Sequence, residues 1–103
     1  MEPLRSDPGE WEPEISLAGE IDYFSTPDVW HAAIKAMNRF GPYVMLDLSA
    51  VTFIDVAGVG ILVQVHEEAA RRGGRLTLGS VPAPVANVIR LTGLDHQLEF
   101  WEL

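Results

Sequence analysis

The chain has 103 residues, a length that corresponds to one domain. Its formal net charge is −8, from 15 acidic and 7 basic side chains. This charge disfavours nucleic acids and anionic membrane surfaces as partners, because both attract cationic proteins. The chain contains no cysteine, which excludes disulfides, thiol catalysis and cysteine-ligated zinc.

The N-terminal composition and the lengths of the apolar runs indicate how the chain is organised. Residues 1–13 are rich in proline and acidic side chains, so we expect a flexible arm or a short edge strand around Leu4. Residues 14–103 are expected to form a single domain. No apolar run approaches the ~20 residues of a membrane-spanning helix, and the start lacks the apolar core of a signal peptide. The sequence therefore predicts a cytoplasmic protein without direct membrane insertion.

The first half of the domain predicts a strand followed by a helix. Polar and apolar residues alternate over 14–18, as in a half-buried strand, and residues 19–22 are expected to form a turn. Thr26 precedes a proline and an aspartate, which predicts that Thr26 is the N-cap of a helix. The helix is expected to reach about Phe40, where a Gly-Pro pair ends it.

The central segment predicts a second strand and a second helix. The apolar run at Tyr43–Leu48 indicates a buried strand, and residues 49–54 are expected to form a loop. Asp55 follows as the N-cap of a helix over about Val56–Arg72. Another strand is expected at Arg75–Leu78, which makes a right-handed βαβ unit with parallel strands.

The last third predicts a short helix and a terminal strand. The helix is expected over Val85–Leu91 and is ended by Gly93. The weak alternation over Leu98–Leu103 is compatible with a short strand. The elements together predict an α/β fold.

The second helix is expected to have a core side and an outer side. The residues expected on the core side are Val59, Leu62, Val63, His66, Ala69 and Ala70. At 100° per residue, Ala57, Ile61, Gln64 and Glu68 are expected to lie on the opposite side. An exposed Ile61 beside Ala57 and Val56 predicts a modest apolar docking patch, although single surface hydrophobic residues are ordinary.

The sequence contains no recognisable catalytic or metal-binding motif. His31, His66 and His96 are not spaced like metal ligands, and no nucleophile elbow is present. Asp47 and Asp55 are a conceivable carboxylate pair, but Asp55 is better explained as a helix cap. We therefore predict a protein that is not an enzyme and has no metal and no cofactor.

Gly58 and Gly60 at the start of the second helix have two interpretations. They lack the further residues of the dinucleotide-binding and P-loop patterns, so phosphate binding is weakly supported. Close packing of the helix on the sheet is the alternative, because glycine has no Cβ atom.

Several segments resemble the STAS domain family, the anti-sigma factor antagonists. The segments that match the family's signatures, in the family's order, are Leu17–Asp22, Ser25–Pro27, Val44–Asp55, Gly58–Gly60, Gly73–Leu76 and Val88–Leu94. The resemblance implies a mixed β-sheet of four to five strands with three or more helices packed mainly on one face. It also implies a function without catalysis.

The resemblance further implies a partner and a switch. In the family's bacterial regulators, the domain binds an anti-sigma factor that is a serine kinase of the histidine-kinase-like ATPase fold, and binding releases a sigma factor. The kinase phosphorylates a serine at the start of the second helix, which breaks the complex. The residues implied to contact the partner are Asp22, Asp55, Val56, Ala57, Gly58, Ile61 and Gln64.

This sequence departs from the family pattern where the phosphorylated serine would stand. The residues there are Asp55-Val56-Ala57-Gly58, so both hydroxyl positions are lost. A phosphoserine adds about −1.5 to −2 charge, and Ala57 has no oxygen to accept a phosphoryl group. The resemblance therefore predicts binding to the anti-sigma factor without phosphorylation at Ala57.

Two other functions are compatible with the same residues. One is a STAS subunit of a lipid-transport complex or of another signalling complex. The other is a small-ligand sensor or enzyme that uses the helix N-terminus as an anion site. A homodimer formed through an exposed edge strand is also compatible with the sequence, although no feature argues for it.

Overall fold

The computed structural model describes residues 14–101. The strands and helices, in chain order, are β1 (Glu14–Ile21), α1 (Thr26–Phe40), β2 (Tyr43–Ile54), α2 (Val56–Arg71), β3 (Arg75–Gly79), α3 (Ala83–Thr92) and β4 (Glu99–Trp101). Two short 3-10 turns add to these, at Tyr23–Ser25 and Asp95–Gln97. The expected N-terminal arm and the end of the expected last strand at Leu103 lie outside the described residues.

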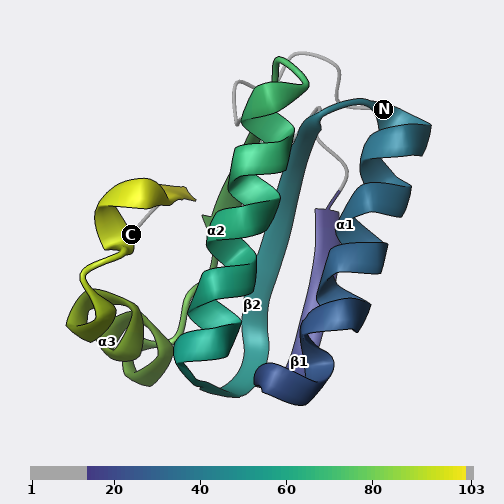
Figure 1. The fold of residues 1–103 in the computed structure, drawn as a ribbon. Helices are drawn as coiled ribbons and strands as arrows, with labels where there is room; N and C mark the ends of the chain where they lie inside the picture. Colours follow the sequence, from purple (N-terminus) through teal and green to yellow (C-terminus); the bar gives the residue numbers. More distant parts are fainter. Residues whose placement is uncertain (1–13, 102–103) are drawn as a thin grey trace.

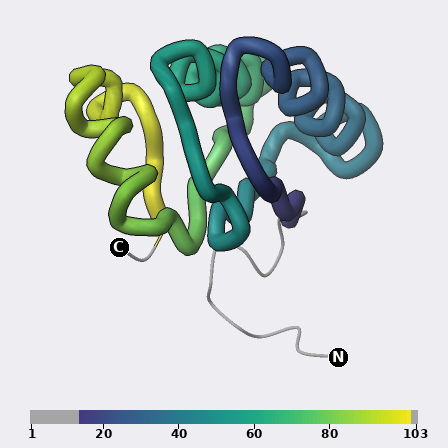
Figure 2. Tube along the Cα trace, turned by 90° about the horizontal axis from the view of Figure 1, so that it is seen from below, coloured from purple at the N-terminus to yellow at the C-terminus, as the bar shows by residue number. Residues whose placement is uncertain are grey.

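The strands form one sheet in the order β1-β2-β3-β4, and each of the three pairings is parallel. The predicted α/β class and the number of strands are confirmed. The helices α1 and α2 cover one face of this sheet (Figures 1 and 2), and α3 lies beside α2 on the side away from α1 (Figure 1). Over residues 14–101 the sheet contains no antiparallel pair, so the mixed character expected for it is not seen in this range.

The largest correction concerns the strands that carry the site. Residues 49–54 are not a loop, because β2 continues without interruption to Ile54. Residues 19–22 are not a turn either, because β1 continues to Ile21. The two extensions pair with each other, with Gly19 beside Val51 and Ile21 beside Ile54. Both strands therefore end at the same edge of the sheet.

The core lies between the sheet and the helices. Alternate residues of β2 point into it, and Val44, Leu46 and Leu48 are almost fully buried. Leu76 and Leu78 of β3 lie in the same buried cluster. Packing of these side chains against α1 and α2 holds both helices over the face of the sheet.

The remaining predicted elements are confirmed with small shifts. The helix expected at Val85–Leu91 is α3, which begins at Ala83 and ends at Thr92, and Gly93 follows as its C-cap in a left-handed conformation. The strand expected at Arg75–Leu78 is β3, and the second helix ends at Arg71.

Candidate functional site

The carboxyl ends of β1 and β2 bring Asp22 and Asp55 to one edge of the sheet. Ile21 and Ile54 are paired residues, and the backbone N–H of Asp55 donates to the carbonyl oxygen of Ile21 at 3.3 Å. The elements that follow each aspartate start from this same edge. In open α/β sheets, ligands and partners are commonly bound at the carboxyl ends of the strands.

Asp22 caps the 3-10 turn that leads into α1. Its Oδ1 atom accepts from the backbone N–H groups of Phe24 and Ser25, both at 3.0 Å. The Ser25 hydroxyl oxygen accepts in return from the N–H of Asp22 at 2.8 Å. This reciprocal pair fixes Asp22 and closes the turn.

The predicted N-cap role of Thr26 is wrong, because the turn changes the position at which α1 begins. Ser25 precedes the helix and Thr26 is its first residue. The Thr26 hydroxyl instead donates to the carbonyl oxygen of Tyr23 at 3.0 Å. Local propensity indicated the helix start to within one residue, but not the turn before it.

Asp55 is the N-cap of α2, as predicted. Its Oδ1 atom accepts from the N–H of Gly58 at 2.8 Å, which satisfies one of the free donors of the first helical turn. The carboxylate-pair hypothesis is wrong, because Asp47 lies eight residues earlier on the same strand. At about 3.3 Å per residue the backbone positions of Asp47 and Asp55 are roughly 26 Å apart, which is too far for their side chains to share a proton.

Gly58 is required by packing. A Cβ atom there would lie 2.2 Å from the carbonyl oxygen of Ile21 and 2.7 Å from Cγ1 of Ile54. The N-terminus of α2 therefore lies directly on the ends of β1 and β2, which confirms the close-packing interpretation. A Cβ atom on Gly60 meets no atom within 4 Å outside the helix backbone, so Gly60 does not serve the same purpose.

The outer side of α2 differs from the predicted one. Ile61 is only 7% exposed, so it cannot belong to a docking surface. Gln64 is exposed, whereas Ala57 is half-buried. Ile61 is covered because α2 lies between α1 and α3 (Figure 1), and burial therefore extends around more of the helix than a single stripe. Ala70, expected on the core side, is exposed.

A group of exposed apolar side chains lies beside the two aspartates, and the sequence analysis missed it. Tyr23 is 70%, Phe24 84% and Val56 70% exposed. The rings of Tyr23 and Phe24 meet edge to face at 5.4 Å between centroids. We call Asp22, Tyr23, Phe24, Asp55 and Val56 the corner. The signal available in the sequence was a pair of aromatic residues between a strand and a helix cap, where no core position was expected.

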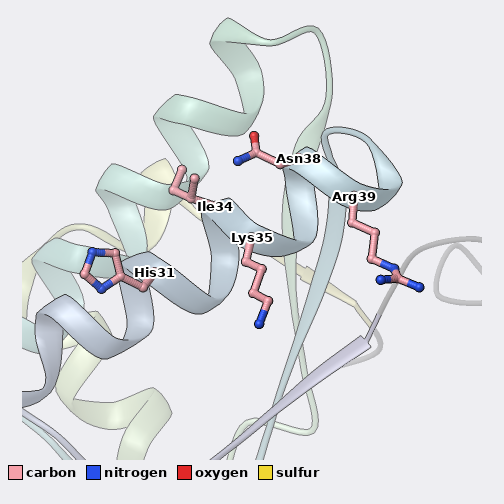
Figure 3. A pocket seen from close by; sticks show the side chains of 5 residues that line it. All are labelled: His31, Ile34, Lys35, Asn38 and Arg39. Atoms are coloured by element: carbon pink, nitrogen blue, oxygen red, sulfur yellow. The ribbon is translucent and has the colours of Figure 1, made fainter.

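Figure 3 shows a hollow along the outer side of α1. Its lining residues are His31, Ile34, Lys35, Asn38 and Arg39. Ile34 and Asn38 point toward α2, and the Asn38 side-chain oxygen accepts from Nη1 of Arg72 at 2.9 Å. Lys35 and Arg39 extend away from that side (Figure 3). The side chains do not converge on one point, so the hollow lacks the polar arrangement of a small-molecule site.

Within residues 14–101, no three histidine or carboxylate side chains are grouped in a way that could hold a metal ion. In the same range, no helix is long and apolar enough to cross a membrane.

Comparison with known proteins identifies the family. A family model described as "Mlab, STAS domain" matches residues 8–101. The chain belongs to the STAS domain family. This confirms the resemblance found in the sequence.

Curated relatives of this STAS domain are bacterial antagonists of anti-sigma factors. An anti-sigma-B factor antagonist from Listeria monocytogenes is 28% identical over 86 residues, covering 84% of this chain and 75% of the relative. An anti-sigma-B factor antagonist from Bacillus subtilis is 27% identical over 86 residues, covering 84% of this chain and 78% of the relative.

Solved structures have the same fold. A crystal structure of an anti-sigma factor antagonist from Mycobacterium paratuberculosis has a TM-score of 0.72 at 28% identity, covering 87% of this chain and 76% of that chain. The murine anion transporter Slc26a9 contains a similar domain, with a TM-score of 0.74 at 18% identity, covering 85% of this chain and 16% of that chain. At that identity the likeness shows the fold alone.

Ala57, which the resemblance predicts to stand where the family has its phosphorylated serine, lies in the first turn of α2. Of the nearby hydroxyl groups, Ser25 donates to the carbonyl oxygen of Glu20 at 3.1 Å and is part of the Asp22 cap. Thr26 is bonded to Tyr23, as described above. Ser49 and Thr52 are exposed on β2, outside the first turn of α2. None of these four hydroxyl groups lies in the first turn of α2.

Proposed function

We propose that this STAS domain is an anti-sigma factor antagonist that regulates sigma-factor-dependent transcription without phosphorylation at Ala57. Its partner would be a serine-kinase-type anti-sigma factor of the histidine-kinase-like ATPase fold. The proposal is supported by the family membership and by the names of the curated relatives. It includes a cytoplasmic location and no catalytic, metal or cofactor role.

The observation that carries the proposal is the chemistry of the first turn of α2. Asp55 and Gly58 keep the helix start fixed on the sheet, whereas Val56 and Ala57 present only carbon to a partner. A kinase that docks here finds no acceptor oxygen at Ala57. The complex therefore lacks the usual means of dissociation, which is a new negative charge in the interface.

The test combines binding and phosphate transfer. The chain is mixed with each kinase-fold anti-sigma factor encoded near its gene, with radiolabelled ATP present. We expect binding and no label on the chain. An Ala57→Ser variant should bind and become labelled, whereas an Ala70→Ser variant, at an exposed position near the other end of α2, should bind and stay unlabelled. Failure to bind any of these kinases would refute the proposal.

An alternative is a STAS subunit of a lipid-transport complex or of another signalling complex. One observation favours it: the segment Asp55-Val56-Ala57-Gly58 lacks both hydroxyl side chains of the family pattern. Affinity purification of the full chain from its own cells separates the two functions. Recovery of transporter subunits instead of a kinase and sigma factor would support the alternative.

A further inference from the structure

The positive charges of this acidic chain are concentrated at one end of the helical layer. Lys35 and Arg39 lie in the last turns of α1, and Arg71 and Arg72 lie at the end of α2. Residues 14–34 and 40–70 contain no lysine or arginine at all. Both helices end at the top of the molecule in Figure 1.

Two of these cations are exposed side chains of α1. Lys35 and Arg39 extend away from the α2 side of the helix (Figure 3), and among residues 14–101 neither has a carboxylate partner. The guanidinium of Arg39 lies 5.3 Å from the centroid of the Phe40 ring. Phe40 is 61% exposed and Tyr43 is 48% exposed. We call these four residues, with Arg71 and Arg72, the basic end.

The basic end is a rigid surface. The Tyr43 hydroxyl donates to the carbonyl oxygen of Gly73 at 3.1 Å, which ties the start of β2 to the end of α2. Arg72 bonds Asn38 of α1 and Glu68 of its own helix. From Lys35 to the end of α1 there is no acidic residue, and the last turns of α2 contribute only Glu67 and Glu68. Positive charge is therefore in excess here.

The opposite end of the helical layer has the complementary character. Asp22 and Asp55 of the corner lie there, with Glu20 at the end of β1 and Asp28 in the first turn of α1. The exposed aromatic and aliphatic side chains of the corner stand among these carboxylates. Each end thus combines exposed apolar groups with charged groups, which are mainly positive at the basic end and negative at the corner.

Helix stability explains part of this distribution. Acidic residues near helix N-termini and basic residues near C-termini each stabilise a helix by about 0.3–1 kcal/mol. This effect does not require large apolar side chains in water at either end. It also does not involve Glu20, which lies on a strand.

We propose that copies of this chain associate head to tail, with the basic end of one copy on the corner of the next. The two surfaces differ, so the contact is heterologous, and every open assembly keeps one free basic end and one free corner. The 15 residues of α1 separate the ends by about 20 Å, so one copy can bind a neighbour at each end. Repulsion between chains of net charge −8 is screened beyond about 8 Å at physiological ionic strength.

The association would have a functional consequence. The corner contains Val56 and adjoins Ala57, so a neighbouring copy covers the surface that the proposed function assigns to the anti-sigma factor. Self-association and binding of the anti-sigma factor would then exclude each other. The self-association itself does not depend on the proposed function, because its test involves no other protein.

Sedimentation velocity of the full chain tests the proposal. Between about 20 μM and about 1 mM, the weight-average sedimentation coefficient should rise with concentration in about 0.15 M salt and stay constant in about 1 M salt. An Arg39→Glu variant should weaken association at least tenfold. An Arg90→Glu variant is the matched control, because it changes the net charge equally but lies on α3. It should associate like the parent chain.

Mixing two variants tests the head-to-tail arrangement. Lys35→Ala/Arg39→Ala removes the two exposed cations of α1 from the basic end without adding acidic groups, and Glu20→Arg/Asp28→Arg reverses the charge beside the corner, so the two altered surfaces do not attract each other. Each variant alone should be monomeric, whereas the mixture should form a dimer and nothing larger, because only one intact pair of surfaces remains. The proposal is overturned if the parent chain stays monomeric to about 1 mM, if Arg39→Glu and Arg90→Glu behave alike, or if the mixture stays monomeric.

Discussion

A Cβ atom on Gly58 would lie 2.2 Å from the carbonyl oxygen of Ile21, so the first turn of α2 and the end of β1 are in backbone contact. This contact holds the capped start of α2 against the strand that leads to Asp22. The corner is therefore built on two strand ends and a helix end that cannot move apart independently. Rigid placement of this kind lowers the entropic cost of binding a partner.

The first prediction follows from this contact. Gly58→Ala should lower the free energy of unfolding by about 1–3 kcal/mol, because a backbone carbonyl cannot yield easily to the new methyl group. Gly60→Ala, two residues further along the same helix, should raise it by up to about 1 kcal/mol, because alanine favours the helix. Urea denaturation of the two variants measures the difference. Equal effects in both would contradict the packing role of Gly58.

The second prediction distinguishes two roles of the Asp55 carboxylate, which are capping of α2 and supply of a negative charge to a partner. Asp55→Asn should leave the stability nearly unchanged, because asparagine caps a helix as well as aspartate does. Asp55→Ala should cost about 0.5–2 kcal/mol, because the N–H of Gly58 loses its acceptor. Thermal unfolding compares the variants. If Asp55→Asn keeps the stability but weakens binding to the anti-sigma factor, the charge itself contacts the partner.

The structure shows which of these features local sequence could reveal. Asp55 and Gly58 were interpreted correctly, because a cap and a close approach depend on the residues of one turn. Ile61 was placed on the wrong side, since its exposure depends on α1 and α3 as well as on helical periodicity. Residues 49–54 do not form the expected loop, because a strand in this segment depends on pairing with β1, which local sequence does not reveal.

Only part of the corner could be predicted from the sequence, because its assembly also depends on tertiary structure. The resemblance implied that Asp22 and Asp55 contact the partner. The sequence pattern does not reveal that the paired ends of β1 and β2 bring the two residues to one edge of the sheet. Tyr23 and Phe24 were missed because they lie in a 3-10 turn that has no hydrophobic period. Their exposure follows from the tertiary structure. The structure therefore adds these two aromatic side chains to the residues of the site.

The third prediction concerns these exposed side chains. Phe24→Ala and Val56→Ala should each leave the stability within about 0.5 kcal/mol of the parent chain, because both side chains lie mostly in water. Each should weaken binding to the anti-sigma factor tenfold or more if the side chain fills a pocket on the partner, as buried apolar anchors do. Leu91→Ala on α3 is the control, since Leu91 is 81% exposed and lies outside the corner. Isothermal titration at concentrations too low for self-association measures the affinities. Equal losses in all three variants would argue against a specific role for the corner.

The fourth prediction concerns Glu68, which lies between Arg71 and Arg72. Hydrogen bonds from Arg71 and then Arg72 hold the pKa of the Glu68 carboxyl at about 2, below its ordinary value of 4.5. A lowered pKa in the folded state stabilises the fold above the ordinary value, and this contribution is lost as the pH falls from 4.5 to about 2. Glu68→Gln should therefore be less stable than the parent chain at pH 7, and the difference should shrink over that window. Glu67→Gln is the control, because it removes the exposed neighbouring carboxyl and leaves the bonds of Glu68 to Arg71 and Arg72 in place. Thermal unfolding at a series of pH values measures both, and a difference for Glu68→Gln that stays constant down to pH 2 would contradict the ion-pair account.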